Sequence, residues 1–155
     1  MMKIAIISPW TVSDTAVGGT ERFVIDLAES LKNLGNEIDV YMLSGESYSK
    51  NEINYININI KGKDGYIEEK TLIDMYGSFS TEESYIKLAN SLEKLINVEK
   101  YDLIQLNSQL FLKAFKNKKR VFTIHTNPFE FRMSFGEDAF ETMINIMKRE
   151  KDEFT

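Results

Sequence analysis

The chain of 155 residues has the length of one domain, and its shares of hydrophobic (43%) and charged (28%) residues are those of an ordinary globular protein. Its net charge of -5 argues against a general nucleic-acid binder, because such domains carry a basic excess. The absence of cysteine excludes disulfides and thiolate metal sites, and a single histidine argues against a zinc site.

The first residues, MMKIAIISPW, indicate a buried strand rather than a signal peptide, because the apolar run stops at Ser8-Pro9. No apolar run approaches the ~20 residues needed to span a bilayer. We therefore expect a cytoplasmic protein whose contact with a membrane, if it has one, is peripheral.

Strands and helices are expected to alternate from the start of the chain. Residues 3–7 are continuously apolar, as in a strand that is buried on both faces of a parallel sheet. An amphipathic helix follows Gly19, and Gly35 is its expected left-handed stop. Its predicted buried stripe consists of Phe23, Val24, Leu27, Ala28 and Leu31. Further strands are predicted over residues 37–43 and 53–60.

The stretch 61–79 has weak periodicity, and we interpret it as a loop that can include a short helix. Ser80 and Glu83 have the spacing of a capping box, and the helix that follows is predicted to bury Ile86, Ala89, Leu92 and Ile96. The remaining predicted elements are a strand (101–107), a short helix (108–115), a strand (120–126) and a helix (138–154) with Phe140, Met143, Ile144 and Met147 on one face.

This order of elements predicts one doubly wound α/β domain over residues 1–155, with a mostly parallel sheet flanked by helices in a Rossmann-like arrangement. Ligands of such folds bind beyond the carboxyl ends of the strands, near the point where the strand order reverses. Three stretches follow predicted strands and so qualify as site segments: Gly18-Gly19, Asn107-Ser108 and His125-Thr126-Asn127.

Gly18 and Gly19 lack side chains, so their backbone can turn tightly and allow a ligand to approach the amides. Thr20 is a candidate cap of the helix, whose N-terminus offers unpaired N–H donors to a phosphate or a sugar hydroxyl. Glu21 lies in the first turn, where the helix dipole favours a carboxylate whatever its function. The alternative is that the turn needs two glycines only to bring the helix back onto the sheet.

His125 is the only imidazole, and at a strand end it can donate a hydrogen bond or transfer a proton; the alternative is a packed histidine bonded to a carbonyl. Asn107 can bind a ligand or simply form a turn. The basic residues Lys113, Lys116, Lys118, Lys119 and Arg120 can contact anionic lipid or phosphate, or remain solvated.

Two kinds of nucleotide site are not indicated. The glycine loop is neither G-x-G-x-x-G nor a phosphate loop ending in G-K-[ST], so a dinucleotide or nucleoside triphosphatase site is not supported. No D-x-D pair occurs, so we expect any sugar-transfer chemistry to be independent of a metal, with no cofactor.

The opening MKIAIISP followed by GGTERFVIDLAESLKNLGNEIDVYML resembles the N-terminal domain of GT-B-type retaining glycosyltransferases of group 1, the family 4-like enzymes. YDLIQLNS is similar to the family's strand that ends in histidine or asparagine, and VFTIHTNPFEF to its strand that ends in histidine. Asn107 occupies a position where many members have histidine, which leaves the acceptor preference open.

The resemblance implies a two-domain enzyme that transfers a sugar from a nucleotide-sugar to a sugar, lipid or protein acceptor. Gly18, Gly19 and Thr20 would approach the donor diphosphate and the acceptor, Glu21 would support the loop, and His125 would bond the transferred sugar beside Asn107, Thr126 and Asn127. The C-terminal nucleotide-sugar domain would belong to the same or a partner chain, and this half alone would be inactive. The alternatives are a nucleotide-sugar epimerase half and a non-catalytic flavodoxin-like module.

Overall fold

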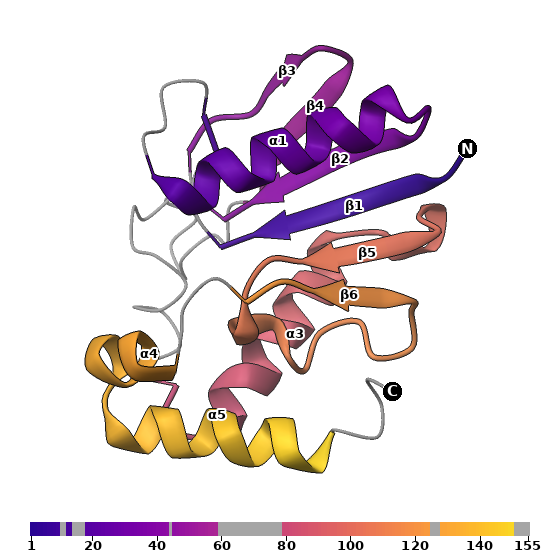
Figure 1. The fold of residues 1–155 in the computed structure, drawn as a ribbon. Coiled ribbons are helices and arrows are strands. Elements are labelled where there is room, and N and C mark those ends of the chain that lie inside the picture. The colour runs from indigo at the N-terminus through magenta and orange to yellow at the C-terminus, as the bar shows by residue number, and fades with distance from the viewer. Residues whose placement is uncertain (10–11, 14–17, 44, 59–78, 125–127, 151–155) are drawn as a thin grey trace, which may run out of the picture.

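A single sheet of six strands organises the part of the chain that the computed structural model describes (Figure 1). The described residues are 1–9, 12–13, 18–43, 45–58, 79–124 and 128–150. The strands, in chain order, are β1 (Lys3–Ser8), β2 (Glu37–Met42), β3 (Tyr48–Lys50), β4 (Ile53–Asn57), β5 (Leu103–Leu106) and β6 (Arg120–Phe122). Their order across the sheet is β3-β4-β2-β1-β5-β6, and every neighbouring pair is parallel except β3 with β4. The predicted mostly parallel α/β fold is confirmed.

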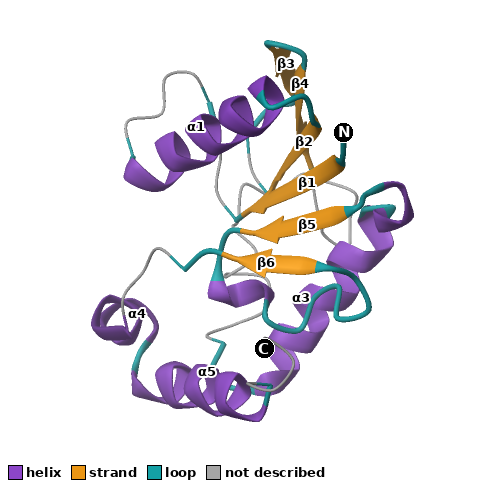
Figure 2. Cartoon of the chain, turned by 45° about the vertical axis from the view of Figure 1, so that its right-hand side comes forward, coloured by secondary structure: helices purple, strands orange, loops and turns teal. Residues whose placement is uncertain are grey.

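Helices cover both faces of the sheet (Figure 2). They are α1 (Gly19–Asn33), α3 (Glu82–Leu95), α4 (Pro128–Phe135) and α5 (Glu137–Arg149), with short 3-10 helices η1 (Val98–Lys100) and η2 (Gln109–Phe111). The alternating side chains of β1 separate the core into two clusters: Ile4 and Ile6 pack with α1, whereas Ala5 and Ile7 pack with α3 and α5. Among the described helices, none is long and apolar enough to cross a membrane.

Helix α1 ends at Asn33, and Gly35, whose φ is +91°, is the left-handed stop that was predicted. The Gly35 amide donates to Lys32 O and the Asn36 amide to Leu31 O, which is the Schellman arrangement that satisfies two terminal carbonyls. The prediction that Phe23 belongs to the buried stripe is wrong, since 36% of it is exposed. Ile25 is buried in its place, because the stripe that faces the sheet is centred on Val24 and Ala28.

Helix α3 differs from its prediction at its start and on its buried face. Its N-cap is Thr81 rather than Ser80, and the cap makes no side-chain hydrogen bond, so the predicted capping box does not form. Ile86 is 43% exposed, while Tyr85 is fully buried against Phe79, with the two ring centroids 5.1 Å apart. The buried stripe therefore runs through Tyr85 and Leu92, and Ile86 lies off it because it is about a third of a turn away from the line of these residues.

The structure has two elements that were not predicted, and its last helix has a different end from the predicted one. Strand β3, which was not predicted, forms a hairpin with β4 through Asn51 and Glu52, both at positive φ. Helix α4 was not predicted either, and α5 ends at Arg149 within the described residues. The predicted loop 61–79 lies outside the described residues except for Phe79, which is fully buried.

Candidate functional site

The strand order reverses between β1 and β5. From β1 the chain proceeds to β2 and β4 on one side, then crosses the sheet to β5 and β6 on the other. The Asn107 amide donates to Ile7 O over 2.9 Å, so the carboxyl ends of β1 and β5 lie side by side. This is the place where doubly wound folds bind their ligands, and it brings Asn107 to the predicted edge.

Three buried polar residues follow β5 at this edge. Asn107, Ser108 and Gln109 are 2%, 8% and 4% exposed, and Ser8 at the end of neighbouring β1 is fully buried. Ser108 Oγ accepts a hydrogen bond from the Leu110 amide (3.1 Å), which starts η2 directly after the strand. Ser8 and Gln109 were not among the predicted site residues, because nothing in the sequence indicates that these two side chains are buried.

The glycine pair stands where the chain enters α1, at the same end of the molecule as the carboxyl ends of the strands (Figure 1). Gly18 has φ -78° and ψ 146°, and neither Gly18 nor Gly19 is at positive φ. A Cβ on Gly19 would meet no atom within 4 Å. The described backbone therefore does not require glycine at these two positions, and the space beside Gly19 is open.

The cap of α1 differs from the prediction. Gly18, not Thr20, is the N-cap, and it makes no side-chain cap bond; Thr20 lies within the first turn. A Cβ on Gly18 would come within 1.9 Å of the position of Glu21 Oε2, so the Glu21 carboxylate folds back over this glycine. The Glu21 carboxylate therefore lies beside Gly18, and the N-cap makes no side-chain hydrogen bond to the first N–H groups of α1.

On the other side of β5, the β6 strand leads toward the third predicted segment. The Thr123 amide donates to Leu106 O (2.9 Å), and Gln105 Nε2 donates to Thr123 Oγ1 (2.7 Å). Gln105 is 5% exposed, and this part-buried bond links β5 to the residue that follows β6. His125, Thr126 and Asn127 lie outside the described residues.

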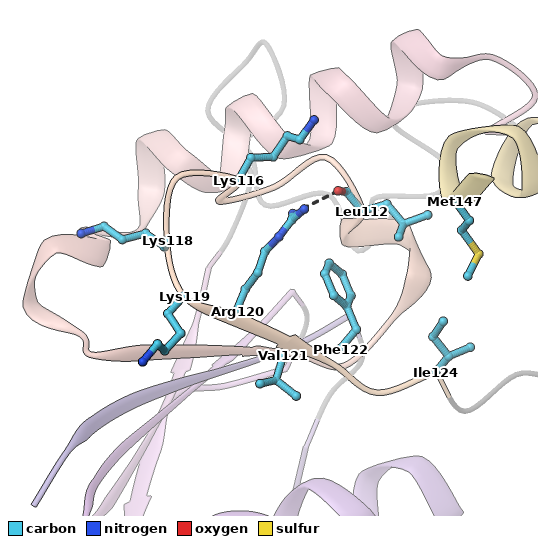
Figure 3. A pocket seen from close by; sticks show the side chains of 9 residues that line it. All are labelled: Leu112, Lys116, Lys118, Lys119, Arg120, Val121, Phe122, Ile124 and Met147. Carbon is cyan, nitrogen blue, oxygen red and sulfur yellow. Dashed lines mark hydrogen bonds between the residues drawn. The ribbon is translucent and has the colours of Figure 1, made fainter. Parts of the chain in front are cut away.

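The basic run after η2 is largely engaged in ion pairs. Lys113 Nζ contacts Glu150 Oε1 (2.5 Å) and Glu82 Oε1 (2.8 Å), Lys116 contacts Glu150 (3.1 Å), and Lys118 contacts Glu99 (2.8 Å). Four of the five basic residues, with Lys113 the exception, line an open groove of about 650 Å³ along β6, shown in Figure 3. The groove lies beside the edge strand and not at the β1–β5 switch point.

A second polar cluster lies at the amino ends of the strands, opposite the candidate site. Tyr101 donates to Asp39 Oδ2 (2.5 Å), Asn54 Nδ2 donates to Asp39 Oδ1 (2.9 Å), and the Tyr41 and Tyr101 hydroxyls are 2.5 Å apart. Burial, with the hydrogen bonds to Asp39 and Tyr41, raises the pKa of Tyr101 far above its usual value. These groups are internally satisfied and link β2 to the start of β5.

In the described part of the chain, no three histidine or carboxylate side chains are grouped so as to hold a metal ion. The candidate site thus lies at the carboxyl ends of the parallel strands. It is formed by backbone amides, the buried side-chain amide of Asn107 and the hydroxyls of Ser8 and Ser108. Comparison with known proteins places this arrangement in a family.

Residues 17–150 match Glycosyltransferase Family 4, and the chain belongs to that family. Over 40 residues it is 48% identical to the alpha-1,3/1,6-mannosyltransferase ALG2 of Yarrowia lipolytica, a segment that is 26% of this chain and 8% of that enzyme. Two structures of sucrose-phosphate synthase from Thermosynechococcus elongatus are similar in fold, with TM-scores of 0.61 and 0.54 and identities of 19% and 18%. Each similarity covers 96% of this chain, and 40% and 70% of the respective synthase chains. The match confirms the predicted resemblance to an N-terminal glycosyltransferase domain.

Proposed function

We propose that this chain is the acceptor-side half of a nucleotide-sugar-dependent, metal-independent retaining glycosyltransferase. The observation that carries the proposal is the family match over residues 17–150, a range that contains every predicted site residue from Gly18 to Asn127. The geometry supports it, because the start of α1, with open space at Gly19, and the buried polar residues after β5 lie at the same edge of the sheet.

In this proposal the start of α1 binds the anionic part of the donor. Unpaired N–H groups and the positive end of the helix dipole favour phosphate oxygens, and the absence of side chains at Gly18 and Gly19 allows those oxygens to come close. Glu21, folded over Gly18, holds the loop in place. His125 donates a hydrogen bond to the transferred sugar, and Asn107, Thr126 and Asn127 contact the sugar or the acceptor.

The nucleotide-binding half of the enzyme is proposed to lie outside these 155 residues. The chain spans 40% of the first sucrose-phosphate synthase chain, and its match with the mannosyltransferase spans 8% of that enzyme. An active site that lies between two domains is complete only when both domains are present. We therefore propose that this half alone does not turn over a nucleotide-sugar. The acceptor is a sugar, lipid or protein, and the site of action is cytoplasmic.

The proposal that nucleotide binding needs a second half of the enzyme is tested by titration calorimetry with a panel of uridine and guanosine diphosphate sugars. The 155-residue chain is expected to bind them weakly or not at all, and a chain extended through the downstream reading frame is expected to bind and turn over one of them. Tight binding by the short chain would contradict the proposed halves. Epimerisation of the nucleotide-sugar without transfer would favour the epimerase, and binding without turnover a non-catalytic module.

The role of His125 is tested in the extended enzyme. His125→Ala is expected to lower turnover at least ~10-fold, because a hydrogen bond that strengthens in the transition state is lost. The melting temperature serves as the control for folding. An unchanged rate with an unchanged melting temperature would assign His125 to packing instead.

A further inference from the structure

Val12 lies in the connection between β1 and α1 and is held by side chains of two other strands. It is fully buried and belongs to the apolar cluster between α1 and the sheet. Its amide donates to Met42 Sδ at the end of β2 over 3.2 Å, and its carbonyl accepts a hydrogen bond from the Tyr48 hydroxyl over 2.8 Å. Because a thioether is a weak acceptor, the bond from the hydroxyl is the stronger of the two. A side chain of β3 therefore fastens the segment that leads to Gly18.

The ring of Tyr48 is itself held in place by the hairpin. Tyr48 pairs with Tyr55 across β3 and β4, and their rings stack with centroids 4.5 Å apart and an angle of 6° between the planes. Tyr55 is 3% exposed, so the ring of Tyr48 packs on the core. At the end of β4 the Asn57 amide donates to Ser47 Oγ (2.9 Å), which fixes the residue before Tyr48. The hydroxyl therefore extends from a restrained ring, and little further rotamer entropy is lost when it bonds Val12.

The bond between Tyr48 and Val12 restrains a long connection next to the candidate site. Strand β1 ends at Ser8 and α1 begins at Gly19, and the conformational entropy of the chain between them opposes any single arrangement. An anchor at Val12 removes part of this freedom before a ligand binds. Binding at the start of α1 then costs less, because the segment that enters the helix is already ordered at one point.

We propose that Tyr48 is a positioning residue for the candidate site and acts through Val12 on the segment that enters α1. This role rests on the proposed function, since it assumes that the start of α1 binds the donor. Tyr48 does not contact the donor; it raises the fraction of molecules whose connection is arranged for binding, and so lowers the apparent dissociation constant. The hairpin of β3 and β4, at the sheet edge opposite β6, thereby contributes to the site.

The anchor is tested by amide hydrogen exchange of the 155-residue chain. Tyr48→Phe removes the hydroxyl and keeps the ring, and it is expected to lower the protection of the Val12 amide roughly 5-fold, the effect of one neutral hydrogen bond. Ser49→Ala is the matched control, because it removes a neighbouring hydroxyl of β3 that bonds Asn54 Oδ1 (3.0 Å) instead. It is expected to leave the Val12 amide unchanged. Unchanged protection in Tyr48→Phe, or equal losses in the two variants, would overturn the proposal.

The effect on the site is tested by steady-state kinetics of the extended enzyme. Tyr48→Phe is expected to raise KM for the nucleotide-sugar roughly 3- to 5-fold at unchanged kcat, because the arrangement with the donor bound is that of the parent. Ser49→Ala is expected to change neither constant. Lower protection of Val12 with both constants unchanged would make the role of Tyr48 merely structural and overturn the proposal. If the extended parent transfers no sugar, the proposed function fails and the role of Tyr48 in the site fails with it, whereas the exchange result still decides whether Tyr48 anchors Val12.

Discussion

Two of the glycines illustrate opposite reasons for using this residue. Gly35 is at φ +91°, a conformation that costs other residues about 1–2 kcal/mol, and it closes α1. Gly19 is an ordinary helical residue with open space around it. The fold thus accounts for Gly35, whereas the proposed ligand accounts for Gly19.

This contrast leads to a paired prediction. Gly35→Ala is expected to lower the free energy of unfolding by about 1–2 kcal/mol without changing substrate binding per folded molecule. Gly19→Ala is expected to leave stability unchanged or slightly raised, because alanine favours the helix, while weakening donor binding in the extended enzyme. Urea unfolding and calorimetry measure the two quantities separately. A Gly19→Ala enzyme with normal donor affinity would contradict the role given to this loop.

For single residues, the sequence predicted that the glycine pair precedes α1 and that Asn107 follows a strand, but the predicted N-cap of α1 was wrong. Thr20 has the side chain that typically caps a helix, and only the backbone shows that α1 already starts at Gly19. Asn107 could be predicted because a polar residue stops an apolar strand. Ser8 could not be distinguished in this way, because its burial depends on how β1 and the chain beyond it are covered.

The elements that could be predicted best are strands with an apolar run and helices with a long apolar stripe. β1 was predicted from a continuous apolar run, β2 and β5 from largely apolar stretches, and α1 and α5 from their apolar stripes. β3 has only three residues, and its turn places Glu52 at positive φ, where asparagine or glycine is usual, so the hairpin signal was weak. Helix α4 starts at Pro128 and is followed by Gly136 at φ +91°, so its ends carry the proline and glycine that are typical of helix boundaries, but it is too short to show an apolar period.

The C-terminal end of α5 is held by an ion-pair network. Glu150 is 4% exposed at the C-cap, where the helix dipole disfavours a carboxylate, and Lys113 and Lys116 both contact its Oε1. The charge of Glu150 is thus compensated by side chains that precede β6, and α5 is tied to the loop beyond η2.

Glu150→Gln is therefore expected to destabilise the fold. The loss should be about 2 kcal/mol, less than for a fully isolated buried pair because Lys113 retains Glu82 as a partner. The matched control is Glu83→Gln, which removes an exposed pair with Lys87 on α3 and should cost less than about 0.5 kcal/mol. Urea midpoints at neutral pH measure both. Equal midpoints for the two variants would show that the buried pairs contribute no more than an exposed one.

For the whole molecule, this network makes stability depend on pH. Hydrogen bonds from Lys113 and then Arg149 hold the pKa of Glu82 below its ordinary value of 4.5. Because the folded-state pKa is the lower one, the contribution of Glu82 is present above about 4.5 and is lost as the pH falls through the folded value. The pairs join α3, α5 and the segment after η2, so their loss loosens the whole face that these elements cover.

Glu82→Gln should thus flatten the acid side of the stability profile. Between about pH 5 and pH 3 the free energy of unfolding of the parent chain is expected to fall more steeply than that of the variant. Glu83→Gln, one residue along, is expected to keep the parent slope. Denaturation midpoints across this range provide the measurement, and parallel profiles for the parent and Glu82→Gln would contradict the role given to these bonds.

The central position of β1 has a consequence for the order of folding. Ile4 pairs with Ile38 on one side and with Leu103 on the other, partners that are near and far along the chain. The unit from β1 to β2 closes a short loop and can form while later residues are still being synthesised, whereas β5 must close a loop of about a hundred residues. Until β5 docks, β1 offers an unpaired apolar edge that is prone to aggregate. The switch point, and the site beside it, is therefore among the last features to be assembled.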